Sequence, residues 1–150
     1  MRVYRITSLS YADDPLSGIG AAITGARWNN KGVRMAYTAA SRSLAILELL
    51  VHVGRQSVPL DRVMVPIDIP DDATEAIASL PSGWNALPYN AEVQAAGDRF
   101  VRDGRSLALR IPSAIVPEEF NVLVNPLHAR RADVVVHPPG DLVWDVRLFG

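Results

Sequence analysis

Residues 25–54, GARWNNKGVRMAYTAASRSLAILELLVHVG, form the stretch around which the rest of the chain is organised. The stretch opens on a polar cluster that begins at Arg27 and then passes through a short apolar run that carries Tyr37. It ends in a segment rich in Leu, Ile, Ala and Val, with one carboxylate, Glu48, in its middle. An anion-binding arginine, an aromatic ring and an acid in this order indicate a ligand site.

The apolar end of this stretch predicts a buried helix of about three and a half turns. Ser41 is its expected N-cap and Gly54 its expected C′ residue. At 100° per residue, the face of Glu48 also carries Ser41, Leu44, Ala45, His52 and Arg55. Two interpretations of this narrow stripe stay open: it faces water with Glu48 as a solvated acid, or it lines a cleft where Glu48 meets a substrate.

Outside the central stretch, alternating and β-rich patterns predict further strands. They are expected at residues 2–7, 33–39, 61–69, 106–111, 121–124, 132–137 and 142–148. Within 61–69, Pro66 indicates an edge strand or a bulge. Helices are expected at 71–80 and from the N-cap Asn90 to about Arg102, with loops at 8–25 and 81–88. Strands and helices without regular βαβ alternation predict an α+β fold.

Length and composition bound the kind of protein. The 150 residues suit one domain, and 49% hydrophobic with 21% charged residues exclude bulk disorder. The absence of cysteine excludes disulfides and thiolate metal sites. A net charge of −1 predicts no concentrated basic surface of the kind that binds nucleic acid, so we expect contact with DNA only through another protein. No long apolar run opens the chain, so we expect a cytoplasmic protein that does not insert in a membrane.

Several common catalytic and metal-binding signatures are missing. The three histidines, His52, His128 and His137, have no paired-ligand spacing, so no metal site is predicted. The chain has no P-loop, no G-x-S-x-G elbow and no complete G-x-G-x-x-G. These absences remove most of the common enzyme classes.

The polar residues of the central stretch each allow two interpretations. Arg27 could grip a phosphate through its planar guanidinium, or it could fix its own loop. Tyr37 could offer its ring to a heteroaromatic ring and its hydroxyl to a phosphate or ribose, or it could be a half-buried strand residue. Trp28 is interpreted as a core residue under the loop.

A second dense stretch lies at residues 106–128. Ser113 follows Pro112 at the end of a predicted strand, where its side chain could enter a cleft or could satisfy a turn backbone. Asn125 and Pro126 predict a turn, with His128 as a packing or hydrogen-bonding partner.

Together the two stretches resemble the RES-domain family, the toxin halves of RES–Xre toxin–antitoxin pairs. The motifs that carry the resemblance are G-A-R-W-N-x-x-G, Y-T-A and L-A-I-L-E-L-L-V-H, then L-R-I-P-S-A-I-V-P and N-V-L-V-N-P-x-H. The match runs from Val3 almost to Gly150. By motif, the family's Arg, Tyr, Glu and Ser correspond to Arg27, Tyr37, Glu48 and Ser113.

The resemblance implies an ADP-ribosyltransferase-like fold, with mostly antiparallel strands in a split sheet flanked by helices. It also implies a cytoplasmic enzyme that takes NAD as its substrate, needs no further cofactor, and cleaves NAD by hydrolysis or phosphorolysis. Two alternatives stay open: a mono-ADP-ribosyltransferase that modifies a protein, and a non-catalytic module that binds a nucleotide or its partner. The implied partner is an Xre-type antitoxin that covers the active site and alone contacts DNA, with a toxin homodimer inside the complex.

The resemblance also implies a role for each matching residue. Glu48 would stabilise an oxocarbenium-like transition state and hold ribose hydroxyls. Arg27 would hold the pyrophosphate, Tyr37 would stack on nicotinamide, and Ser113 would bond the carboxamide or a ribose. Arg5 stands on the first predicted strand, where related toxins carry a basic residue, so Arg5 and Arg27 could share or exchange the phosphate role.

Overall fold

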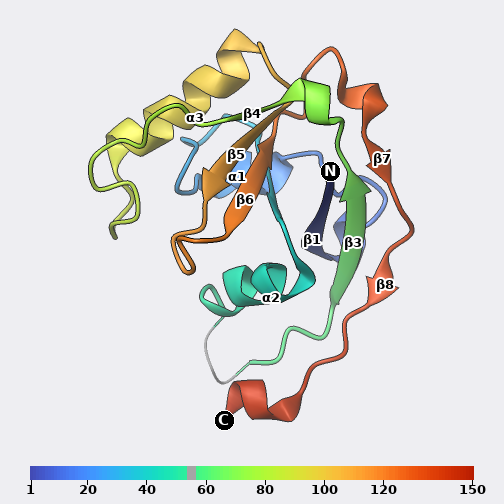
Figure 1. Ribbon diagram of the computed structural model, residues 1–150. Coiled ribbons are helices and arrows are strands. Elements are labelled where there is room, and N and C mark those ends of the chain that lie inside the picture. Colours follow the sequence, from blue (N-terminus) through green and yellow to red (C-terminus); the bar gives the residue numbers. More distant parts are fainter. Residues whose placement is uncertain (54–56) are drawn as a thin grey trace.

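The computed structural model describes residues 1–53 and 57–150, which form a curled, mostly antiparallel sheet with three α-helices (Figure 1). The strands are β1 (Arg2–Ser8), β2 (Ala36–Ala39), β3 (Arg62–Asp68), β4 (Thr74–Ala76), β5 (Ala108–Pro112), β6 (Phe120–Val124), β7 (Val135–Val136) and β8 (Gly140–Asp141). Their order is β4-β5-β6-β2-β1-β3-β7, with β8 also on β3. Among the strand pairs of the described residues, only β4–β5 is parallel. The α+β prediction is confirmed.

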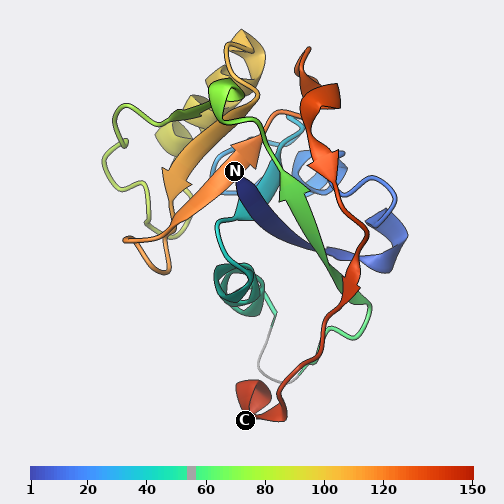
Figure 2. The ribbon, with the colours of Figure 1, turned by 45° about the vertical axis from the view of Figure 1, so that its right-hand side comes forward.

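The sheet is nearly split between β1 and β2. These two neighbours share one residue pair, Tyr4 with Ala39. By contrast, β1 pairs with β3 along its whole length, from Arg2 opposite Asp68 to Ser8 opposite Arg62. Figures 1 and 2 accordingly show the β1–β3 pair and the β5–β6 pair as two differently oriented halves. The expected split sheet is therefore present, and it opens beside Tyr4.

One row of residues crosses this junction. Tyr4 pairs with Ala39, Ala39 with Asn121, and Asn121 with Ile111, so the row spans β1, β2, β6 and β5. Side chains of directly paired residues point to the same face of a sheet. The side chains of this row therefore all lie on one face of the sheet, and they form the base of the space above that face.

The helix α2 (Arg42–Leu50) begins directly after β2 and packs on β1 and β2. The hydroxyl of Ser41 accepts a hydrogen bond from the Leu44 N–H at 3.1 Å, which confirms Ser41 as the N-cap. The helix is shorter than the predicted three and a half turns: it has 9 residues, and Val51 is its C-cap. Gly54 and Arg55 themselves lie outside the described residues.

The orientation of α2 differs from the predicted buried helix. Leu44 and Ala45, on the face of Glu48, are buried, whereas Leu47, about 100° round the helix from Glu48, is 41% exposed. The side of the helix with Leu44, Ala45 and Glu48 therefore faces the protein, and the side with Leu47 faces outward. The prediction of a buried helix therefore holds only for the side that packs on the sheet, because α2 has the sheet on one side only and composition alone does not reveal which side is covered.

The helix α3 (Ala91–Asp103) covers β5 and β6 (Figure 1). Asn90 caps it by accepting a hydrogen bond from the Glu92 N–H at 2.8 Å, and Gly104 ends it in the left-handed conformation. Both ends match the prediction. Val93 and Phe100 pack with residues of β5, β6 and the central stretch, which are Trp28, Met35, Leu109, Ile111 and Leu123.

Four predicted segments differ from the structure. Residues 8–25, expected as a loop, contain the helix α1 (Ile19–Thr24). Residues 71–80, expected as a helix, form a 3-10 turn (Asp71–Ala73) followed by β4, because pairing with β5 takes up the backbone groups that a helix would use internally. The strand expected at 132–137 shrinks to β7, preceded by a 3-10 turn (Arg131–Asp133).

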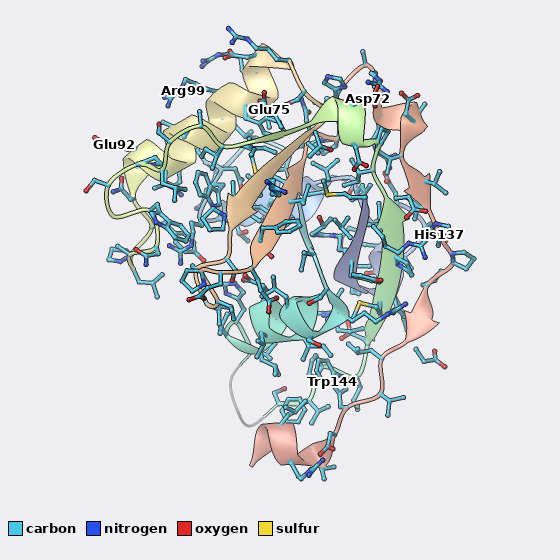
Figure 3. All side chains as sticks on the ribbon, viewed as in Figure 1. Asp72, Glu75, Glu92, Arg99, His137 and Trp144 are labelled. Carbon is cyan, nitrogen blue, oxygen red and sulfur yellow. The ribbon has the colours of Figure 1, made fainter. Side chains whose placement is uncertain are left out.

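The chain end is the fourth difference. The strand expected at 142–148 is absent, and Val146–Phe149 form a 3-10 turn instead. Trp144 packs edge-on against Phe149 and its indole N–H donates to the Pro59 carbonyl at 3.1 Å. These contacts fold the segment back beneath α2 (Figure 3), so it lies away from the sheet edge.

Pro66 lies where the outer side of β3 is least covered. β7 pairs with Ile67 and Asp68, and β8 pairs with Val63 and Met64, so Pro66 falls between the two short strands. The missing N–H of proline therefore interrupts no ladder bond there. The edge-strand or bulge interpretation is wrong, because β3 runs in unbroken register with β1 and carries β7 and β8 on its other side. Within the described residues, no helix has the length and apolar character needed to cross a membrane.

The close approach of α3 to the central stretch depends on Gly97. A Cβ at this position would lie 1.7 Å from the Trp28 carbonyl oxygen, which is far inside van der Waals contact. We expect Gly97→Ala to lower the free energy of unfolding by about 3 kcal/mol or more, because backbone has to move. Gly20→Ala is the matched control, since a Cβ there meets nothing within 4 Å, and it should change stability by less than about 1 kcal/mol. Equal thermal midpoints for both variants would contradict the expected clash.

Candidate functional site

A cavity of about 660 Å³ lies at the split in the sheet, within the size range of small-molecule sites. Its wall has four parts. They are the row of paired residues from Tyr4 to Ile111 that crosses the split, the side of α2 that carries Glu48, the start of the central stretch, and the loop at 85–89. The polar and charged side chains that matter most in this wall are Arg5, Arg27, Tyr37, Glu48, His52 and Asn121. The second interpretation of the Glu48 stripe, that it lines a cleft, is therefore the one that the structure supports.

The carboxylate of Glu48 is held on one oxygen. Its Oε1 accepts hydrogen bonds from the Ser113 hydroxyl at 2.8 Å and from the Asn121 side-chain N–H at 2.5 Å. In the described part of the chain, no group donates to Oε2. Anchoring one oxygen fixes the plane of the carboxylate and leaves the other oxygen to contact a ligand.

Ser113 lies behind the cavity wall. It is fully buried, and its hydroxyl oxygen accepts hydrogen bonds from the Ile115 and Val116 N–H groups at 3.1 Å each. With both lone pairs used, the hydroxyl proton has to point to Glu48. Ser113 therefore satisfies a turn backbone, as one interpretation expected, and its side chain does not line the cavity but donates to Glu48, which does.

Arg5 carries a positive charge into the cavity wall. Its Nη1 donates to the Tyr37 carbonyl at 2.7 Å, which bridges the gap where β1 and β2 separate. Burial lowers the pKa of Arg5 to about 10, so the guanidinium is still charged at neutral pH. No carboxylate of the described residues lies within ion-pair distance of Arg5, and its buried Nε has no hydrogen-bond partner there. The charge is therefore uncompensated.

Arg27 is engaged with the rim of the cavity. Its Nη1 donates to the carbonyls of Trp84 at 3.1 Å and Ala86 at 2.9 Å, and its guanidinium lies 5.0 Å from the centre of the Tyr89 ring. Asn85, Leu87 and Tyr89 line the cavity, so Arg27 fixes a stretch that forms part of the wall. The loop-fixing interpretation of Arg27 is correct for these contacts, and the guanidinium also lines the cavity.

Tyr37 uses its hydroxyl inside the protein. The hydroxyl accepts from the Trp28 N–H at 3.0 Å and donates to the Asn29 side-chain carbonyl at 2.7 Å. Desolvation by burial raises the pKa of Tyr37. Because the hydroxyl is occupied, what Tyr37 offers the cavity is its ring. Trp28 is buried, as expected for a core residue.

The remaining polar candidates are structural. The Asn125 side-chain carbonyl accepts from the Leu127 N–H at 3.0 Å, and His128 Nδ1 accepts from the Arg130 N–H at 3.0 Å, which fits the predicted turn. Ser106, the other serine at the start of the second dense stretch, is buried and does not line the cavity. Across residues 1–53 and 57–150, no three histidine, aspartate or glutamate side chains gather as metal ligands would.

Asn121 is the residue of this site that the sequence interpretation missed. It stood in the quoted N-V-L-V-N-P motif but was given no role. A signal was present, because Asn121 is a polar residue inside the apolar strand FNVLV, at a position that faces the same side as Leu123. A polar residue at such a position needs a partner, and here the partner is Glu48.

The whole of this arrangement falls within one recognised domain. Residues 2–145 match the RES domain. A protein of Sphingobium sp. named Prs ADP-ribosylating toxin is 40% identical over 145 residues, covering 93% of this chain and 90% of that protein. A protein of Photorhabdus laumondii named Toxin Res is 41% identical over 129 residues, covering 85% of this chain and 83% of that protein.

A solved structure has a similar fold. A chain in the crystal structure of the M. tuberculosis MbcT–MbcA toxin–antitoxin complex superposes with a TM-score of 0.76, over 99% of this chain and 86% of that chain. Its sequence is 21% identical, so this likeness concerns the fold. With the domain match and the two relatives, the conclusion is that this chain belongs to the RES-domain family.

Proposed function

We propose that the cavity binds NAD and that the protein cleaves the bond between nicotinamide and ribose. The observation that carries this proposal is the pairing, in one cavity of about 660 Å³, of a carboxylate anchored on one oxygen with an arginine whose charge has no acidic partner among the described residues. A ligand that satisfies both has an anionic part and a part that becomes cationic during reaction. NAD has both.

The diphosphate of NAD suits Arg5. An anion beside a buried, uncompensated guanidinium offsets the cost of burying that charge. This assignment moves the main phosphate contact from Arg27 to Arg5, because the Nη1 of Arg27 is already bonded to two carbonyls. The ring of Tyr37 offers a flat surface for the nicotinamide, and its occupied hydroxyl holds that ring still.

The cleavage step follows from the position of Glu48. When the bond from the ribose C1′ to the nicotinamide nitrogen breaks, nicotinamide leaves as a neutral molecule with the bonding electron pair. Positive charge is left on the ribose C1′ and ring oxygen, as in glycoside cleavage. The free Oε2 of Glu48 stabilises this charge or holds a ribose hydroxyl. Water or phosphate then adds to C1′ and loses a proton, which gives ADP-ribose or its phosphorylated form.

A second candidate function has support from one relative. The Sphingobium protein, 40% identical to this chain, is named as a toxin that ADP-ribosylates Prs. The same cleavage serves this function, with a protein side chain in place of water as the acceptor. The two candidates therefore share Glu48 and Arg5 and differ only in the fate of the ADP-ribosyl group.

The cellular role that we propose is that of the toxin in a toxin–antitoxin pair. The Photorhabdus relative is named a toxin, and the solved neighbour belongs to a toxin–antitoxin complex. We propose an Xre-type antitoxin that covers the cavity and makes the DNA contacts itself, and a toxin homodimer within the complex. Binding of purified antitoxin should then compete with NAD for the cavity.

The first prediction concerns Glu48. Glu48→Gln keeps the shape of the side chain and removes its charge, so it should slow NAD loss by roughly 100-fold or more. The measurement is NAD concentration over time with purified protein, with and without phosphate, using NAD labelled in adenine. Label in ADP-ribose, in its phosphorylated form or on added Prs protein identifies the acceptor.

Glu75→Gln is the matched control for this experiment. Glu75 is exposed on β4, far from α2 in Figure 3, and should keep wild-type activity. If wild-type protein consumed no NAD under any of these conditions, or if Glu48→Gln consumed it at the wild-type rate, the proposed function would be wrong.

The second prediction separates the two arginines. Arg5→Gln should raise KM for NAD by roughly 10- to 150-fold, because it removes charge-assisted hydrogen bonds to the diphosphate. It should also abolish the rise in thermal midpoint that pyrophosphate gives the wild type. Arg27→Gln should loosen the rim and lower activity but keep the pyrophosphate effect. The reverse pattern would return the phosphate role to Arg27.

A further inference from the structure

We propose that Asn121 is a positioning residue for this reaction: its side-chain amide, together with Ser113, holds the Glu48 carboxylate so that Oε2 faces the substrate. This inference rests on the proposed cleavage of NAD. It assigns a role to a residue that contacts the carboxylate and that neither the motif comparison nor the RES match singles out.

The backbone of Asn121 is held on both sides. It pairs with Ala39 on β2 and with Ile111 on β5, in the row that crosses the split in the sheet. A residue inside two ladders has little freedom to shift, so its amide group is delivered to a fixed point. Nδ2 lies 2.5 Å from Glu48 Oε1, so the amide donates directly to the carboxylate.

Contact with the Glu48 carboxylate sets which way the Asn121 amide group is turned. With Nδ2 on Glu48, the Asn121 Oδ1 is buried and has no hydrogen-bond donor among the described residues. Turning the amide over would place Oδ1 against the carboxylate oxygen, acceptor against acceptor. The Asn121 amide therefore donates to Glu48 although its own oxygen, Oδ1, has no donor among the described residues.

A purely structural role would look different, and Asn125 on the same segment provides the comparison. Its amide donates to the Val101 carbonyl at 3.1 Å and its oxygen accepts from the Leu127 N–H, so it ties local backbone together. The Asn121 side chain makes no such backbone bond within the described residues, and its one hydrogen bond goes to Glu48. Its contribution is directed at the carboxylate.

Asn121 and Ser113 hold the same oxygen from different strands. Ser113 follows the end of β5 and Asn121 lies on β6, so the two donors approach Oε1 from separate points. With only one donor, the carboxylate can rotate about the remaining bond. With both, its plane is set before the substrate arrives, which is the preorganisation that transition-state stabilisation requires.

The sharpest test is Asn121→Asp, which keeps the size of the side chain and replaces the donor by a second carboxylate. Two carboxylates in contact repel, which raises the pKa of the pair, and a proton shared between them restores the missing hydrogen bond. We expect NAD cleavage by this variant to be strongly reduced at pH 8 and to recover towards pH 5 relative to wild type. The same change at the α3 cap, Asn90→Asp, should leave the rate and its pH profile unchanged.

The other titratable groups in the cavity do not affect the comparison between Asn121→Asp and wild type at each pH. They are Tyr4, Arg5, Arg27, Tyr37, His52 and Tyr89. All of these groups, the imidazole of His52 included, are present in wild type and variant alike. The ratio of the two rates at each pH therefore isolates the change at position 121.

Asn121→Ala gives an independent readout. It should lower kcat by roughly 10- to 150-fold with KM nearly unchanged, as expected when a bond that positions a catalytic group is lost. A rise in KM alone would mean that Asn121 binds substrate, and would overturn the positioning role. A wild-type kcat would overturn it as well.

A measurement without substrate separates this proposal from the proposed function. The side-chain carboxyl of Glu48, followed by NMR during a pH titration of ligand-free protein, should titrate at higher pH in Asn121→Asp than in wild type. Thermal melting verifies that the variant is folded. If wild type cleaves no NAD but this shift is present, the proposed function fails and the contact stands. An unshifted Glu48 in the folded variant overturns the inference.

Discussion

The site depends on the place where two neighbouring strands, β1 and β2, share only one residue pair, Tyr4 with Ala39. Beyond this pair β1 and β2 separate, which leaves the Tyr37 carbonyl without a strand partner and opens room above the row that ends at Ile111. The guanidinium of Arg5 takes the place of the missing ladder bond. A buried charge without an acidic partner in residues 1–53 and 57–150 is thereby placed in the cavity wall, and an anionic ligand would compensate it.

The position of Glu48 follows from the same place in the sheet. α2 starts three residues after Ala39, so its inward face meets the two strand ends that carry Ser113 and Asn121. Each of these donors is held by backbone bonds of its own. The carboxylate is therefore held by two donors, one from each side of the hairpin formed by β5 and β6. Its second oxygen accepts no hydrogen bond from the described residues and can contact a ligand.

Local patterns predicted the parts of the fold that local interactions hold together. The N-caps at Ser41 and Asn90, the end of α3 at Gly104 and the alternation of β1 and β6 depend on residues within a few positions of each other. The predictions failed at 71–80 and 142–148, where distant contacts decide the backbone. β4 exists because β5 pairs with it, and the chain end folds back because Trp144 binds the Pro59 carbonyl.

The sequence by itself determined the α+β class, the N-caps of two helices and the set of residue types at the site, and its motifs identified the family. Only the tertiary structure decided which partner each of those side chains meets. Ser113 and Asn121 are 65 and 73 positions from Glu48, and Arg27 is 57 and 59 positions from its carbonyls. Contacts over such separations are set by the curl and register of the sheet, because neighbouring residues in the chain carry no record of which distant strand will lie opposite them.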